Sequence, residues 1–212
     1  MYTLNPASRQ RGVVLMITLI VLVIMALAGI SLTRSVDTAN SIAGNLAFQQ
    51  SASQSADAGL ERAVEWLEAN GVNAVLRDDA PLLGYSAGSD NRDPAPGQTW
   101  DSFWTNVLAN QAMTLNYVSE NVVAPVPYGS QANPDGAGNT VSYAIQRMCD
   151  ATTLNQMQHN RACSQPPSTA RTGTSKNGSV PLNFNDQGYY RVTVRVAGPR
   201  NTVVYAQALV AM

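Results

Sequence analysis

The side chains that most often carry catalysis are scarce in this chain of 212 residues. It has one histidine, His159, so a serine, histidine and aspartate arrangement has to use that residue. His159 lies among glutamines and asparagines, in a stretch that predicts a solvated loop. The sequence contains no glycine-rich phosphate loop and no HExxH pair. We therefore expect no enzyme activity, no catalytic residue and no cofactor.

The two cysteines, Cys149 and Cys163, favour a disulfide over a metal site. They have no CxxC spacing, and a single histidine does not complete a zinc ligand set, so we expect no metal. In an oxidising compartment the pair predicts one disulfide, worth about 3 kcal/mol for a loop near 15 residues. Carboxylates at residues 90–93 and 135–136 lack the ligand density of an EF-hand loop, and calcium binding there stays an open alternative.

An acidic stripe is the third polar feature. Asp57, Glu61, Glu65 and Glu68 recur at helical spacing, with Arg62 beside them. Such a stripe is typical of a solvated helix face. The functional alternative is electrostatic docking to a neighbouring subunit, with Asp57, Glu61 and Glu65 as the candidate contacts.

An apolar segment near the N-terminus predicts that the chain is anchored in a membrane. Residues 12–33 contain no charged residue, and residues 13–32 are almost all aliphatic. Twenty helical residues span about 30 Å, the thickness of a bilayer core. Arg9 and Arg11 precede the segment, which favours a cytoplasmic N-terminus and an exported remainder. We predict a transmembrane helix over residues 13–33 that stays in the mature protein.

The same helix is expected to continue through residues 34–70 as an amphipathic segment. This stretch has no proline, and Asn70 followed by Gly71 is an apt helix stop. A helix over residues 13–69 would be about 85 Å long and would need partners beyond the rest of the chain. Its small side chains would let neighbouring helices approach closely. They are Ala39, Ala43, Ala52, Ala56 and Ala63.

Residues 71–212 predict an extracytoplasmic α+β domain. Residues 71–98 are expected to be irregular, and a short helix after Thr99, rich in aromatic residues, is expected to dock on a sheet. Strands are predicted at residues 115–123, 140–148, 189–196 and 202–210, the last two joined as a hairpin by the turn at residues 198–201. In the strand at 189–196, the valines are expected to face the core, with Arg191, Thr193 and Arg195 facing water.

Composition excludes one class of partner. The net charge is −1 and only 13% of the residues are charged, against 45% hydrophobic. The broad positive field of a nucleic-acid binder is absent, so we expect no nucleic-acid partner. Weak long-range repulsion between copies suits a component of an assembly.

The N-terminal residues resemble the class III leader of type IV pilins and pseudopilins. A short basic stretch ending in glycine directly precedes the apolar segment: Arg9, Gln10, Arg11, Gly12. The PilX family of minor pilins is similar at residues 42–45, 47–50, 57–61, 190–193 and 198–203. The resemblance implies a pilin-like fold and a leader, residues 1–12, that prepilin peptidase cuts after Gly12. It also implies a methylated new N-terminus at Val13.

Ile17 is a departure from most pilins, which carry glutamate at the fifth mature position. In the family, that glutamate is thought to pair with the N-terminal amine of an adjacent subunit. A carboxylate in lipid needs a cationic partner, so its absence implies that none is required. This resembles pilins placed at the fibre apex. The implied partners are other minor pilins and a large tip adhesin, after residence in inner-membrane lipid with a periplasmic C-terminal domain.

Two alternatives stay open. One is the tip pseudopilin of a type II secretion system, which shares the same leader and helix. The other is a membrane-anchored binding protein that never assembles and keeps an uncut N-terminus.

Overall fold

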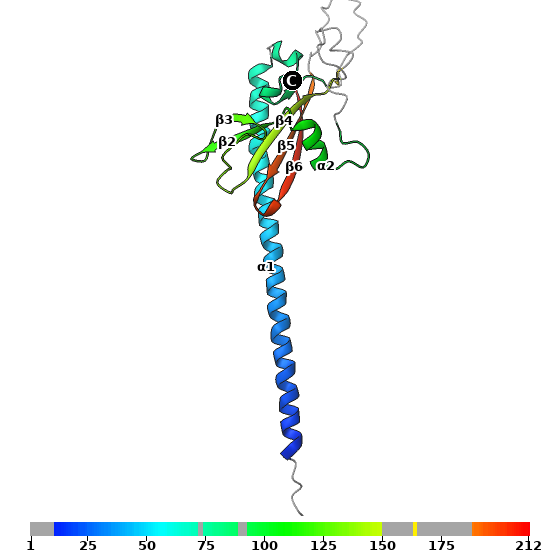
Figure 1. Cartoon of the computed structure of the whole chain (residues 1–212), viewed down its shortest axis with the longest axis vertical. Coiled ribbons are helices and arrows are strands. Elements are labelled where there is room, and N and C mark those ends of the chain that lie inside the picture. The colour runs from blue at the N-terminus through cyan, green and yellow to red at the C-terminus, as the bar shows by residue number, and fades with distance from the viewer. Residues whose placement is uncertain (1–10, 72–73, 89–92, 150–162, 165–187) are drawn as a thin grey trace, which may run out of the picture. The chain divides into compact units, whose positions relative to one another are not determined.

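The computed structural model describes residues 11–71, 74–88, 93–149, 163–164 and 188–212 (Figure 1). The chain forms two compact units, Met1–Ala47 and Phe48–Met212, which we describe separately. One helix, α1 (Arg11–Asn70), makes up the described part of the first unit and contributes residues 48–70 to the other. The helix ends at Asn70 as predicted, and begins two residues before the predicted start at residue 13.

In the first unit, the helix is apolar and uncovered. Residues 12–43 are all exposed. The hydroxyl groups of two threonines are satisfied within the helix: Thr18 Oγ1 donates to the carbonyl oxygen of Leu15 at 3.0 Å, and Thr33 Oγ1 to that of Ile30 at 2.9 Å. Because an unpaired hydroxyl is costly in an apolar medium, these bonds make both threonines compatible with lipid or with neighbouring helices.

The second unit is built on one sheet, and its antiparallel strands confirm the predicted α+β, pilin-like fold. The strand order is β3-β2-β4-β5-β6, and the short β1 pairs with β4 in the parallel sense. The strand bounds are β1 (Tyr85–Ser86), β2 (Met113–Val118), β3 (Asn121–Pro127), β4 (Thr140–Arg147), β5 (Tyr189–Ala197) and β6 (Val203–Ala211). The predicted strands at 140–148, 189–196 and 202–210 therefore match within one residue at each end.

The second half of α1 packs closely on one face of this sheet. Ala52, Ala56 and Ala63 are buried against it. At Gly59 a Cβ atom would lie 2.8 Å from methyl groups of both Val141 and Val194. The small side chains here thus serve contact within the chain, which corrects the expectation that this part of the stripe receives neighbouring helices.

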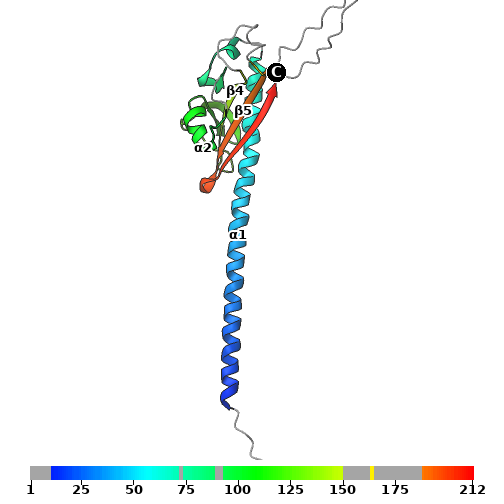
Figure 2. The same cartoon turned by 90° about the vertical axis from the view of Figure 1, so that its right-hand side faces the viewer.

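A second helical layer covers the opposite face (Figures 1 and 2). It consists of α2 (Trp100–Phe103) and the π-helical turn η3 (Trp104–Leu108). Phe103, Trp104 and Leu108 are buried against the sheet, together with Ala144 of β4. The predicted short aromatic helix and its docking to a sheet are therefore confirmed.

This second layer explains why the prediction for β5 is partly wrong. Arg191 and Thr193 were expected to face water, but they are 6% and 1% exposed. β5 lies inside the sheet, and both of its faces are covered. This is usual for strands of parallel sheets, whereas an antiparallel sheet often leaves one face in water. Side chains still alternate between the two faces of β5, but residues on both faces are buried.

The predicted strand at 115–123 is also wrong, because it is a hairpin. β2 turns into β3 at Ser119 and Glu120, whose φ angles are +49° and +67°. Pro125 and Pro127 lie in β3. This is an edge strand, where a residue without an N–H is tolerated.

The segment at 71–98, expected to be irregular, contains short regular elements among its described residues. They are the 3-10 turns η1 (Ala74–Arg77) and η2 (Pro81–Leu83), together with β1. The predicted turn between β5 and β6 is present as η4 (Pro199–Asn201). Here Arg200 adopts a left-handed conformation, with its guanidinium carbon 5.6 Å from the ring centre of Phe48.

Candidate functional site

The proposed processing positions lie at the beginning of α1. Gly12 and Val13 are helical and exposed, and no atom lies within 4 Å of the position that a Cβ at Gly12 would take. Ile17 is one turn further and 55% exposed. The structure thus leaves all three positions accessible, while cleavage, methylation and the role of Ile17 stay predictions.

The surface of this helix segment can do one kind of chemistry, which is apolar association. Among the described residues there is one helix long and apolar enough to cross a membrane, and its most apolar window has a mean hydropathy of 3.1. None of that window is buried within the chain. Aliphatic side chains at this density need lipid or other apolar helices around them.

The acidic stripe lies on the exposed side of the second half of α1. Asp57, Glu61, Glu65 and Glu68 are all exposed. Arg62 Nη1 lies 2.5 Å from Glu65 Oε2, which leaves the other three carboxylates without an ion pair to a described residue. Such an exposed pair contributes at most about 1 kcal/mol. The stripe is therefore a negatively charged surface and contributes little to stability.

Beside this stripe runs an open groove of about 690 Å³. Its apolar lining comes from Ala58, Leu60 and Val64 of α1 and from Val122 of β3. Its charged lining comes from Glu61, Arg62, Glu65 and Glu68. The structure thus brings two of the three candidate contacts, Glu61 and Glu65, to one apolar hollow, while Asp57 lies outside its lining.

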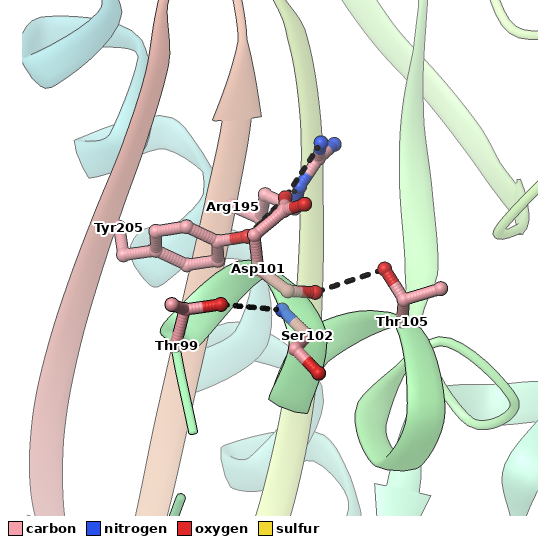
Figure 3. Close-up of polar contacts among 6 residues, drawn as sticks. All are labelled: Thr99, Asp101, Ser102, Thr105, Arg195 and Tyr205. Atoms are coloured by element: carbon pink, nitrogen blue, oxygen red, sulfur yellow. Dashed lines mark hydrogen bonds and ion pairs between the residues drawn. The ribbon is translucent and has the colours of Figure 1, made fainter. Parts of the chain in front are cut away.

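A polar cluster joins α2 to the β5–β6 hairpin, as Figure 3 shows. The hydroxyl of Tyr205 donates to Asp101 Oδ1 at 3.0 Å, and Arg195 Nε donates to the same hydroxyl at 3.2 Å. Burial raises the pKa of the Tyr205 hydroxyl to about 12, against the lowering effect of its hydrogen bond from Arg195. Thr99 caps α2 by accepting from the Ser102 amide at 3.3 Å. The cluster holds two elements together and contains no activated nucleophile.

A second arginine cluster was not foreseen from the sequence. Arg191 Nη2 donates to Gln146 Oε1 at 2.9 Å, and Arg191 Nη1 lies 2.5 Å from Asp93. On the neighbouring strand, Arg147 Nε donates to the carbonyl oxygen of Ala87 at 2.6 Å. These arginines tie the segment before α2 to the sheet. The alternation of Arg191 with valines in the sequence looked like a solvated face, so no local signal marked this arginine as buried.

The loop at residues 135–136, considered above for calcium, has a structural use. Both carboxylate oxygens of Asp135 accept hydrogen bonds, Oδ1 from the Ala137 and Asn139 amides and Oδ2 from Ser55 Oγ. Asn139 Nδ2 donates to Ser51 Oγ at 3.0 Å and to Ser55 Oγ at 2.9 Å. The loop is thus fixed to α1 through its carboxylate and amide groups.

The predicted disulfide is present between Cys149 and Cys163. No group of three or more histidine, cysteine, aspartate or glutamate side chains that could hold a metal occurs in the part of the chain that the structure describes. His159 and the aspartate and arginine at positions 90 and 92 lie outside the described residues.

Comparison with known proteins relates part of the chain to a protein family. Residues 11–61 match the family model described as PilX N-terminal. No curated protein and no solved structure matches the chain significantly. The matched segment covers most of α1, including the apolar part and the acidic stripe up to Glu61. The match, with the long helix that continues into a domain built on an antiparallel sheet, supports the resemblance of this chain to the PilX family of pilins through its N-terminal helix.

Proposed function

We propose that this chain is a minor pilin that joins the tip or priming complex of a type IV pilus, where it promotes assembly and the display of a large tip adhesin. The observation that carries the proposal is the match over residues 11–61, on a helix whose apolar surface is wholly exposed. Prepilin peptidase removes residues 1–12, and Val13 becomes the methylated N-terminus. The chain then waits in the inner membrane with its C-terminal domain in the periplasm.

Assembly in this proposal is a transfer from lipid to other helices, with no catalytic step. The side chains of residues 13–32 exchange lipid contacts for contacts with neighbouring pilins, so the exchange needs little apolar driving force and depends on close packing. Ile17 supports a place at the apex of the fibre. An aliphatic side chain is uncharged in lipid and therefore needs no cationic partner from a subunit above it.

The groove beside the acidic stripe supports contact with another minor pilin. Four of its lining residues are apolar, Glu61 and Glu65 also line it, and Asp57 lies one turn earlier on α1. An amphipathic segment with basic residues on one edge has the complementary chemistry. Charge here acts mainly on the rate and register of docking, so we expect the affinity to come from the apolar lining.

The test is to substitute the glycine at the cleavage junction with a larger residue. We expect Gly12→Leu to leave the leader attached and to reduce pilus formation. Gly29→Leu is the matched control for leader removal, since Gly29 lies in the same helix with nothing within 4 Å of its Cβ position and is far from the junction, and we expect this variant to lose residues 1–12 normally. Intact mass with and without reduction reports the loss of residues 1–12, the methyl group and the disulfide together. Normal processing and normal pili in Gly12→Leu would contradict the proposal.

The tip pseudopilin of a type II secretion system is the second candidate, since Ile17 is equally suited to the apex of that shorter fibre. Deletion of the gene separates the two. Loss of twitching motility with intact protein secretion supports the pilus, and the reverse result supports the secretion system. An uncut N-terminus in the wild-type chain would support a membrane-anchored binding protein that never assembles.

A further inference from the structure

The two edges of the sheet are built very differently. The β3 edge carries Pro125 and Pro127, and its pairing with β2 shifts register between Thr114 and Asn116. Proline and irregular pairing are features that keep an edge strand from pairing with other chains. The opposite edge, β6, has nine residues in regular register with β5 and contains no proline, glycine or charged residue. One edge is protected against pairing, and the other carries no further strand among the described residues.

The register shows which backbone groups β6 offers. Met212 and Gly188 exchange both of their backbone hydrogen bonds, so every second residue back along β6 also bonds to β5. The residues between them direct their N–H and C=O groups away from the sheet. These are Val203, Tyr205, Gln207, Leu209 and Ala211. Their outward backbone groups have no partner among the described residues.

The side chains along β6 fit the same use. Leu209 is 66% exposed and Val203 is 41% exposed. An exposed, regular and uncharged edge of this length is prone to pair with any available strand. Figure 2 looks at this side of the domain and shows β6 in front of α1, with no other described strand beyond it.

We propose that β6 is an interaction site that takes an extended strand of a different polypeptide, which adds to the sheet as a further strand. The unpaired backbone groups specify the ligand, because only an extended backbone can satisfy donors and acceptors that alternate along one line. The absence of charge on β6 calls for a segment that is itself largely uncharged next to the edge.

A second copy of this chain fits the edge less well. Arg200, just before β6, lies at Phe48, and Met212 lies next to Gly71, so β6 runs in the same direction as this part of α1. Antiparallel pairing of two β6 strands would therefore point the two helices in opposite directions, whereas subunits inserted alike in one membrane point the same way. Parallel pairing needs a shift of one residue between the copies, so no two-fold axis can relate them.

Site-specific photocrosslinking of the full chain, in the cells that produce it, tests this site. A photoreactive phenylalanine analogue replaces Val203, Leu209 or Ala211 in turn, and replaces Leu82, which is 75% exposed on η2, as the control. We expect cross-links to one other polypeptide from the three β6 positions. The cross-linked residue should move along that polypeptide by two residues between positions 209 and 211, and by six between 203 and 209. If the cross-linked residue number rises with the probe position, the pairing is parallel, and if it falls, the pairing is antiparallel.

A blocking variant adds an independent measurement. Leu209→Pro removes an outward N–H and leaves the bonds to β5 in place, so we expect the cross-link yield at position 203 to fall about tenfold. Leu209→Gln is the matched control, since it changes the side chain and keeps the N–H, and we expect the yield to stay within about twofold. Circular dichroism of both purified full chains in detergent checks that the sheet is retained.

Three results would overturn the inference: no cross-link from the β6 positions, cross-linked sites that do not move with the probe, or cross-links to β6 of a second copy. If Leu209→Pro does not fold, the movement of the cross-linked sites still decides the question. The inference does not rest on the proposed function. Cross-links from β6 in a chain whose leader is uncut would keep the strand-addition site and contradict the minor-pilin proposal.

Discussion

Arginine side chains carry much of the charge inside this domain. Arg191 and Arg147 are buried within the sheet, at 6% and 3% exposure, and Arg195 is largely covered. Each makes hydrogen bonds to groups from another segment: Arg191 to Gln146 and Asp93, Arg147 to Ala87, and Arg195 to Tyr205. Since a buried charge without partners is strongly destabilising, these bonds fix where the segment before α2 lies.

At this scale we predict an alkaline loss of stability that depends on Tyr205. The pKa of its hydroxyl is raised from 10.0 in the unfolded chain to about 12 in the folded domain. The protonated hydroxyl therefore contributes its full stability below pH 10, and this contribution is lost as the pH rises through about 12. Because Tyr205 is only half-buried, solvent reduces the size of the effect.

Chemical denaturation between pH 8 and pH 12 measures it in the wild type and in Tyr205→Phe. We expect the variant to be less stable by about 1 kcal/mol at pH 8, where it lacks two hydrogen bonds. Its stability should then fall less steeply above pH 10 than that of the wild type. Burial also raises the pKa of Tyr85, Tyr143 and Tyr190, so some fall remains in the variant. Equal slopes in the two proteins would contradict the prediction.

At the scale of elements, contact between α1 and the sheet depends on residues without bulk. Ala52, Ala56 and Ala63 are buried, and Gly59 lies where the helix comes closest to β4 and β5. The same type of residue continues on α1 before the domain, at Gly44, where no atom lies within 4 Å of the Cβ position. Gly59 therefore has no room for a side chain, whereas Gly44 has open space beside it.

We predict that Gly59→Ala destabilises the domain and that Gly44→Ala does not. Alanine is the better helix former by about 1 kcal/mol, which is the effect expected on its own at Gly44. At Gly59 the added methyl would lie 2.8 Å from two valine methyl groups, and overpacking of this kind costs about 1–3 kcal/mol. We expect a net loss of about 1 kcal/mol for Gly59→Ala in urea unfolding of the full chain in detergent. A gain in stability would show that the valines move aside freely.

The same elements show what the sequence could and could not predict. The helix to Asn70 and the β5–β6 hairpin were predictable, because long periodicity and a Gly-Pro turn are local signals. The β2–β3 turn was missed because Ser119 and Glu120 take left-handed conformations that glycine or asparagine normally mark.

The buried position of Arg191 was missed for a different reason. The groups that Arg191 contacts are Asp93 and Gln146, which lie far from β5 in the sequence. Alternation in a single strand cannot reveal whether a second layer lies above it. At the candidate site, the apolar helix and the disulfide were predictable from composition and spacing, whereas the groove is lined by both α1 and Val122 of β3, which the sequence does not bring together.

At the scale of the whole molecule, the low charge is spread over both units. The chain carries 13 basic and 14 acidic residues in 212, and several of the described ones are used in internal ion pairs. Few charges are left to keep copies apart, which suits a component that packs against other subunits. The domain also has one covalent cross-link, between Cys149 and Cys163.

We predict that loss of the Cys149–Cys163 disulfide lowers the stability of the domain by about 3 kcal/mol, the entropy of closing a loop of this size in the unfolded chain. The double substitution Cys149→Ser with Cys163→Ser is compared with the wild type in denaturant, with and without reductant. Reduced wild type and the double variant should have the same lowered midpoint. If reduction leaves the wild-type midpoint unchanged, the bond has no stabilising effect and the prediction is wrong.

The loop that contains Asp135 and Asn139 has a mechanical consequence. It is attached to Ser51 and Ser55, one turn apart on α1, by three side-chain hydrogen bonds of 2.6 to 3.0 Å. A tension applied along α1 loads these bonds together, in shear, because they join the same loop to successive turns of the helix. They must then break at the same moment and not one after another. The hydrogen bonds of this loop thus resist separation of the sheet from α1 under tension.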